Sequence, residues 1–255
     1  RFEHCWSGDH NNPNEISLLD LSRKPGKTNP RTLSIDLGGR QVTGVSFLPP
    51  LKVDGVERHL VAVTGDGAFR LVDLNDLGTT GALIPLTDED DLRSVVPRQF
   101  LTREEDGERE TMIFVLADGS EDIYGVSLGP SADGKTPYSA TLNQFESGGT
   151  PLDMVVTEEA GRPLLIALAR DGGWSSIAVV DVDTSDVFTI RLEDSVSEAL
   201  LLEQGGGAEV VLYGDDSQGV HFLAVDGLPE EKGRNLDHVW VPDQVSEAVL
   251  LGDGR

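Results

Sequence analysis

Short runs of apolar residues alternate with polar turns along the chain, and several of the turns contain a Gly-Asp or Asp-Gly pair. In one copy, the apolar run 60–63 is followed by the turn 65–67 and by a second run at 68–74. The runs are rich in β-branched and aromatic residues, which favour strands. Because Asp and Gly accept the positive φ of a tight hairpin turn, each copy predicts two antiparallel strands.

The Asp of these turns recurs at intervals of 44 to 57 residues, at Asp9, Asp66, Asp118, Asp171 and Asp215. A second motif, Asp194-Ser-Val-Ser-Glu-Ala-Leu-Leu-Leu, recurs 49 residues later as Asp243-Gln-Val-Ser-Glu-Ala-Val-Leu-Leu. Repeats of this length that consist of short strands are typical of β-propellers. The pattern therefore predicts an all-β fold, a β-propeller of four-stranded blades.

Each repeat divides into four strands, and the second strand is apolar at nearly every position, as in a strand covered on both faces. The five predicted blades comprise residues 245–251 with 1–37, 42–86, 95–142, 152–192 and 196–241. The chain starts without a first strand and ends with a surplus one at 245–251. We expect either a closed five-bladed ring, in which this strand completes the first blade, or part of a larger propeller. In both cases, residues 1–255 form a single propeller domain.

The predicted core lies at interior positions of the strands, between neighbouring blades. It includes Cys5, Val61, Val63, Ile113, Val115, Leu165, Ala167 and Val211. Cys5 is the single cysteine, so no intrachain disulfide is expected, and it matches the small apolar Ala62 of the next repeat.

Three predicted third strands resemble the WD-repeat and YVTN-type repeats of known propellers. They read Ser17-Leu-Leu-Asp-Leu, Arg70-Leu-Val-Asp-Leu and Ile177-Ala-Val-Val-Asp-Val-Asp-Thr. The resemblance spans most of the chain. It implies a rigid platform for protein–protein interaction, because propellers of these families most often serve as such platforms.

The chain of 255 residues is strongly acidic, with 45 Asp and Glu against 20 Lys and Arg and a formal net charge of −25. Such a surface repels phosphate backbones, so nucleic acid is not an expected partner. No apolar stretch approaches membrane-spanning length, and no membrane insertion is expected. The sequence starts at Arg1 in a strand-like run, as expected for a mature chain or an excised fragment. We expect an extracytoplasmic location: periplasmic, cell-surface or secreted.

Candidate binding residues lie in the loops between second and third strands and between successive blades, which form one rim of the predicted propeller, here the upper rim. They are Asp9, His10, Asp66, Asp88, Glu89, Asp90, Asp91, Asp118, Asp171, Trp174 and Asp215. All five lysines fall in other loops. This polarity predicts a surface for a cation or a basic protein partner. Alternatively, Asp is present because it is a good turn residue, and Trp174 packs against the adjacent blade.

The run Asp88-Glu-Asp-Asp supplies the oxygen ligands that calcium binds, but it lacks the spacing of a recognised calcium loop. No cofactor is therefore expected. Calcium is the ion that the carboxylates of this loop would suit. We predict no nucleophilic serine or cysteine and no catalytic residue. The predicted function is a non-catalytic binding or assembly module. The alternative is a metal-dependent propeller hydrolase or lactonase with a cation at the ring axis.

Overall fold

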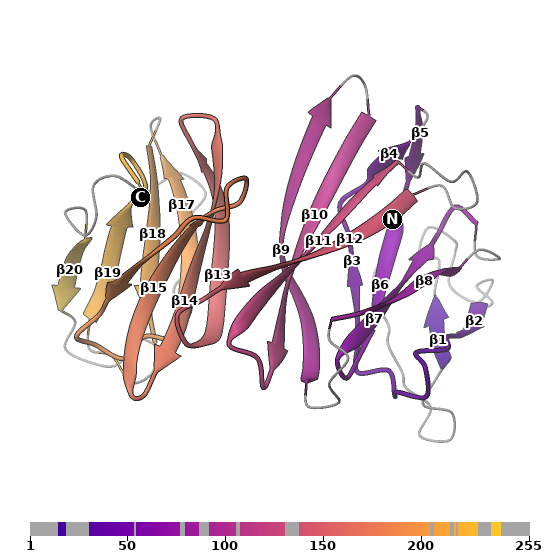
Figure 1. The fold of residues 1–255 in the computed structure, drawn as a ribbon, viewed down its shortest axis with the longest axis horizontal. Coiled ribbons are helices and arrows are strands. Elements are labelled where there is room, and N and C mark those ends of the chain that lie inside the picture. The colour runs from indigo at the N-terminus through magenta and orange to yellow at the C-terminus, as the bar shows by residue number, and fades with distance from the viewer. Residues whose placement is uncertain are drawn as a thin grey trace, which may run out of the picture. The chain divides into compact units, whose positions relative to one another are not determined.

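The computed structural model describes residues 15–18, 31–53, 55–76, 80–86, 92–105, 108–130, 138–204, 207–214, 217, 219–228 and 236–240. Within these residues the chain forms the strands β1 to β20 and no helix (Figure 1). The chain divides into two compact units. Unit 1 comprises Arg1–Pro97, Thr102–Thr111 and Ser127–Thr141, and unit 2 comprises Arg98–Leu101, Met112–Val126 and Leu142–Arg255.

Unit 1 contains a two-stranded sheet and a four-stranded antiparallel sheet. The two-stranded sheet pairs β1 (Glu15–Leu18) with β2 (Arg31–Ser34). The four-stranded sheet has the order β3 (Gly44–Phe47), β6 (Leu60–Gly65), β7 (Ala68–Asp73) and β8 (Thr80–Pro85). A short hairpin, β4 (Leu51–Val53) and β5 (Val56–Arg58), lies between β3 and β6 in sequence, and β4 pairs with β10. The sequence pattern did not predict this hairpin.

The next four strands run through both units. They are β9 (Arg93–Glu105), β10 (Glu108–Asp118), β11 (Asp122–Pro130) and β12 (Tyr138–Glu146), and each pairs with its neighbour in sequence.

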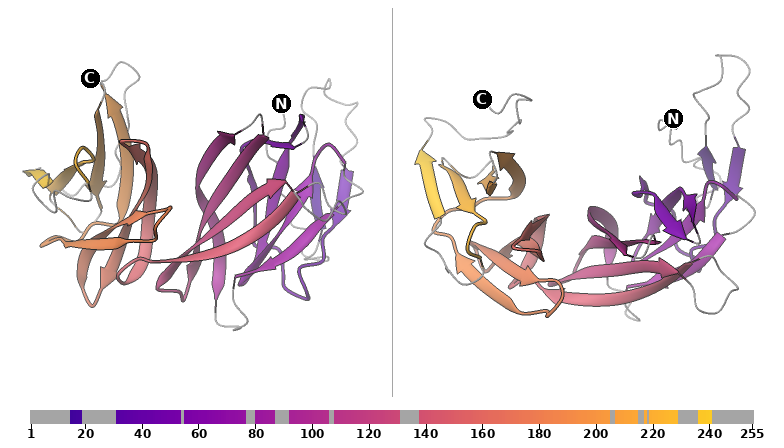
Figure 2. Two further views of the ribbon diagram at one scale, coloured as in Figure 1. Left: turned by 45° about the horizontal axis from the view of Figure 1, so that its top comes forward. Right: turned by 90° about the horizontal axis from the view of Figure 1, so that it is seen from above.

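Unit 2 contains two four-stranded antiparallel sheets in simple chain order. Their strands are coloured from pink through orange to yellow in Figure 2. The first consists of β13 (Thr150–Glu159), β14 (Arg162–Asp171), β15 (Trp174–Asp181) and β16 (Val187–Arg191). The second consists of β17 (Glu198–Gln204), β18 (Gly207–Tyr213), β19 (Gly219–Ala224) and β20 (Leu236–Trp240). The predicted blades 42–86, 95–142, 152–192 and 196–241 thus each match one antiparallel run of four strands, although β12 continues to Glu146 and β13 starts at Thr150.

The second strand of each meander contains a run of at least three consecutive buried residues, as its apolar sequence predicts. All six residues of β6 are buried, and the central seven of β14 are buried as well. Within unit 2, Phe114 and Ile123 pack with Met154 and Leu165, so the core lies between successive sheets. The predicted burial is confirmed at Val61, Val63, Ile113, Val115, Leu165, Ala167 and Val211. Cys5 and the predicted strands 2–7 and 245–251 lie outside the described residues, so ring closure and a single-domain organisation stay predictions.

Candidate functional site

The predicted hairpin turns are present at the end of the second strand, which we call the upper end of each sheet. Asp66 lies between β6 and β7, Asp118 ends β10, and Asp171 ends β14; all three side chains are exposed. The glycine that follows each of them has a positive φ, of 64° at Gly67, 92° at Gly119 and 62° at Gly172. The Asp-Gly pairs therefore form the tight turns that their sequence predicts.

The structure pairs only two of the described candidates directly. Asp171 and Trp174 lie opposite each other at the last pair of the β14–β15 ladder. Asp66 belongs to unit 1, whereas Asp118 and Asp171 belong to unit 2. The remaining candidates lie outside the described residues: Asp9, His10, Asp88, Glu89, Asp90, Asp91 and Asp215.

Three carboxyl groups gather at the upper end of the β11–β12 pair. Burial raises the pKa of Asp122, and the nearby charges of Glu146 and Glu121 raise that pKa further. The Ser147 hydroxyl donates a hydrogen bond of 2.6 Å to the Glu121 carbonyl oxygen, which joins the end of β12 to the start of β11. Like charges held this close produce a concentrated negative potential. We call Glu121, Asp122 and Glu146 the carboxylate cluster.

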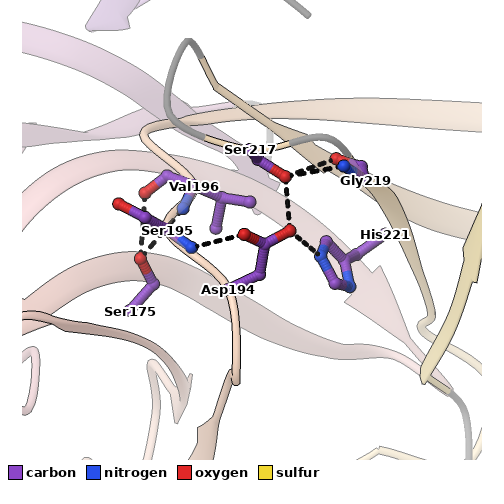
Figure 3. Close-up of polar contacts among 7 residues, drawn as sticks. All are labelled: Ser175, Asp194, Ser195, Val196, Ser217, Gly219 and His221. Atoms are coloured by element: carbon purple, nitrogen blue, oxygen red, sulfur yellow. Dashed lines mark hydrogen bonds and ion pairs between the residues drawn. The ribbon is translucent and has the colours of Figure 1, made fainter. Parts of the chain in front are cut away.

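A second polar group lies at the upper end of the β17–β20 sheet (Figure 3). Asp194 Oδ2 accepts a hydrogen bond from Ser217 Oγ and lies 3.1 Å from His221 Nε2. Asp194 Oδ1 accepts the backbone N–H of Ser195 at 2.8 Å. Because a carboxylate is only an acceptor, the proton of the contact between Asp194 and His221 must be on His221 Nε2.

The charged form of Asp194 is stabilised in this setting. Burial alone would raise its pKa, but the hydrogen bonds from Ser217, His221 and the Ser195 N–H outweigh burial and hold the pKa below 3.8. The Gly219 N–H also donates to Ser217 Oγ at 2.9 Å. The carboxylate thus fixes the segment before β17 to the turn between β18 and β19.

This Ser-Asp-His group does not have the order of a catalytic triad. In a triad the histidine accepts the serine proton and the carboxylate orients the histidine. Here the carboxylate is the central group, and both Ser217 and His221 donate to it. His221 therefore does not accept the Ser217 proton, and the group ties the segment before β17 to the β18–β19 turn.

One sequence with the spacing of a nucleophile elbow was overlooked by the sequence reasoning: Gly125-Val-Ser127-Leu-Gly129. The structure places it inside β11, an extended strand. A nucleophile elbow instead requires a sharp strand-to-helix turn. A Cβ at Gly125 would lie 2.6 Å from Phe145 Cε2. Close packing against Phe145 therefore explains why residue 125 is a glycine.

Trp174 is the first residue of β15, and its side chain is 48% exposed. The guanidinium carbon of Arg191 lies 4.8 Å from the indole centroid, a cation–π contact. Arg170, near the end of β14, donates to Ser195 Oγ at 3.3 Å. The polarity predicted from the sequence rested on the positions of the lysines and left out Arg170 and Arg191, which lie at the upper ends of β14 and β16.

Two linkages connect neighbouring sheets of unit 2. The hydroxyl of Ser175 bonds to both backbone groups of Val196. Asp153, which follows a bulge in β13, lies 3.5 Å from Arg98 and accepts the N–H of Ala199 at 3.0 Å. Asp153 therefore couples three successive first strands, β9, β13 and β17, and Ser175 links β15 to the segment that precedes β17.

Two kinds of feature are absent from the part of the chain that the structure describes. No group of three or more His, Cys, Asp or Glu side chains there is arranged to hold a metal ion. Nor do those residues include a helix long and apolar enough to cross a membrane. The acidic run that suggested calcium, 88–91, is outside this part.

No protein-family model and no curated protein sequence matches the chain. The WD40 domain of SCAP from fission yeast aligns with a TM-score of 0.51 and 11% identity, over 92% of this chain and 51% of that one. The dihydro-heme d1 dehydrogenase NirN in complex with DHE aligns with a TM-score of 0.50 and 15% identity, over 84% of this chain and 41% of that one. The chain therefore spans about half or less of each matched chain.

These similarities concern the fold alone. Together with the antiparallel meanders, they confirm the predicted all-β propeller fold and its likeness to WD-repeat propellers.

Proposed function

We propose that the protein is a non-catalytic binding platform that takes a basic segment of a partner protein at the upper ends of its sheets. The carboxylate cluster carries this proposal, because Glu121 and Glu146 lie close enough to Asp122 to raise its pKa. A lysine or arginine of a partner would relieve this repulsion. The exposed carboxylates of Asp118 and Asp171 lie in upper turns of the same unit and add to the negative potential.

A rigid framework supports the platform role. Ser175 and Asp153 link neighbouring sheets, and Asp194 fixes the entry to β17 onto the β18–β19 turn. Held in this way, the upper turns would lose little conformational entropy when a partner binds.

The test measures binding of a fluorescein-labelled hexalysine peptide by anisotropy at about 0.05 and about 0.3 M salt, since salt screens exposed charges. The variant Glu121→Gln/Asp122→Asn/Glu146→Gln should bind more weakly than the wild type, and the difference should shrink at high salt. The control Glu158→Gln/Glu203→Gln/Glu209→Gln removes the same charge from exposed positions away from the upper ends. Equal binding by the two triple variants would show that the cluster is not the site.

Under this proposal the partner complex is extracytoplasmic: secreted, periplasmic or at the cell surface. Fractionation of cells that express the tagged full-length protein tests the location. The hydrolase or lactonase alternative is tested by metal analysis of the purified protein and an ester and lactone turnover screen.

A further inference from the structure

Trp174 and Arg191 form an exposed pair on one face of the β13–β16 sheet. Arg191 lies opposite Ser176 on the neighbouring strand, and side chains alternate between faces, so Trp174, Ser176 and Arg191 share a face. The contact of 4.8 Å between the guanidinium carbon and the indole centroid agrees with this register. Both side chains are accessible to solvent.

Arg191 is unusual in so acidic a chain. The sequence has 45 carboxylate side chains against 20 basic ones, yet no described carboxylate lies within ion-pair distance of Arg191. The guanidinium is held by an aromatic ring, which leaves its hydrogen-bond donors available. An arginine fork that is already positioned is well suited to bind a carboxylate with two hydrogen bonds.

The backbone beside the indole leaves room for a ligand. Gly172 and Gly173 both have a positive φ, of 62° and 127°. Apart from the glycine itself and its two chain neighbours, no described residue has an atom within 4 Å of the position that a Cβ would take at either glycine. On the shared face, the Ser176 hydroxyl is buried and has no hydrogen-bond partner among the described groups.

We propose that Trp174 and Arg191 bind a short acidic segment of a partner protein. A carboxylate of that segment pairs with Arg191, and an adjacent apolar side chain covers the exposed part of Trp174. Tryptophan and arginine are the residues most enriched at the energetic centres of protein interfaces. A peptide suits this site better than a saccharide, because Arg191 already occupies one face of the ring on which a sugar would stack.

This inference goes beyond the basic-partner proposal and makes the opposite prediction at one residue. Asp171 lies opposite Trp174 on the same face and repels an incoming carboxylate. Asp171→Asn should therefore strengthen binding of an acidic peptide. The same substitution should weaken binding of the hexalysine probe, so failure of one proposal does not imply failure of the other.

The experiment uses the full chain and a blocked, fluorescein-labelled peptide, Gly-Glu-Phe-Glu-Gly, at about 0.15 M ionic strength. At this salt, the long-range repulsion from the net negative charge is screened beyond about 8 Å, whereas direct contacts persist. We expect Arg191→Gln and Trp174→Ala each to weaken binding by at least about fivefold. Arg170→Gln is the matched control, because residue 170 lies on the opposite face of the sheet, and it should change binding by less than about twofold.

Two further peptides define the ligand chemistry. Gly-Gln-Phe-Gln-Gly and Gly-Glu-Gly-Glu-Gly should both bind more weakly than the parent peptide. Any of four results would overturn the proposal: no binding of the parent peptide at millimolar concentration, unchanged binding by Arg191→Gln, equal binding of the glutamine peptide, or tighter binding of an oligouronate than of any peptide. Self-association of the chain that Trp174→Ala abolishes would also overturn it in favour of a contact between copies. Arg191 is exposed, so its variant should remain folded, and circular dichroism checks this.

Discussion

The hydroxyl of Ser175 bonds to both backbone groups of one residue, Val196, which lies 21 positions further along the chain. It donates to the Val196 carbonyl oxygen at 3.1 Å and accepts the Val196 N–H at 3.0 Å. Ser175 is fully buried at the start of β15, and Val196 precedes β17. The hydroxyl of Ser175 therefore links the β13–β16 sheet to the segment that leads into β17.

Removing this hydroxyl should destabilise the fold. In Ser175→Ala, two buried backbone groups lose their partner, and the free energy of unfolding should fall by about 1–3 kcal/mol. The neighbouring Ser176→Ala is the control, because the Ser176 hydroxyl is buried and has no hydrogen-bond partner among the residues that the structure describes. Its removal should be neutral or slightly stabilising. Urea denaturation measures both, and equal losses in the two variants would contradict the linkage.

The stability contribution of Asp194 should depend on pH. Its pKa in the folded state lies below the ordinary value of 3.8, so folding favours the charged form. The contribution is complete above the unfolded-state pKa and is lost as the pH falls through the folded-state pKa. Asp194→Asn should therefore lower stability at pH 7 and pH 5, by about 1–3 kcal/mol. The difference from the wild type should shrink as the pH falls below about 3.8. A stability difference between Asp194→Asn and the wild type that stays constant from pH 7 to pH 2 would disprove this pH dependence.

Neutralising Asp122 should have the opposite effect on stability at neutral pH. Its pKa is raised by burial and by Glu146 and Glu121, so the charged form is disfavoured in the folded state. Asp122→Asn should stabilise the protein at neutral pH, by less than about 1 kcal/mol because the site is partly solvated. The gain should disappear once the pH is low enough to protonate the wild-type carboxyl. Thermal unfolding at pH 7 and pH 4 tests this, with Asp118→Asn as an exposed control in the same turn.

The repeat pattern predicted the sheets well because burial of the second strand and the Asp-Gly turn are both local properties. The β4–β5 hairpin was missed because its strands have three residues each and follow two prolines, Pro49 and Pro50. The strand β9 extends to Glu105, four residues beyond the apolar run, because backbone pairing with β10 continues through polar residues. Hydrophobic pattern cannot detect that extension.

The site residues were harder to predict. Asp194 was visible as a repeated position, but nothing in the sequence placed Ser217 and His221 beside it, 23 and 27 residues away. The carboxylate cluster likewise depends on the β11–β12 pairing, which brings Glu146 to Asp122. Trp174 was predicted in an upper turn and lies at its end. Its contact with Arg191 depends on the register of β15 and β16.

The buried second strands should be sensitive to truncation. Ile113 is fully buried in β10, and Ile113→Ala should lower the free energy of unfolding by about 2–5 kcal/mol through lost burial and a cavity. Val96→Ala is the control, because Val96 is 42% exposed in the adjacent β9. Its effect should stay within about 0.5 kcal/mol. A soluble Ile113→Ala protein with an unchanged denaturation midpoint would show that the strand is not part of the core.

Gly125 should matter for packing rather than for catalysis. A Cβ at this position would meet Phe145 Cε2 at 2.6 Å, and Phe145 is buried against Phe114. Gly125→Ala should therefore destabilise the protein by about 1–3 kcal/mol, as overpacking does. Replacing the ring in Gly125→Ala/Phe145→Leu should recover part of the loss relative to Phe145→Leu alone, because the clash is removed. If Ser127 were a nucleophile, a fluorophosphonate probe would label the wild type and spare Ser127→Ala. We expect neither protein to be labelled, since Ser127 lies within an extended strand.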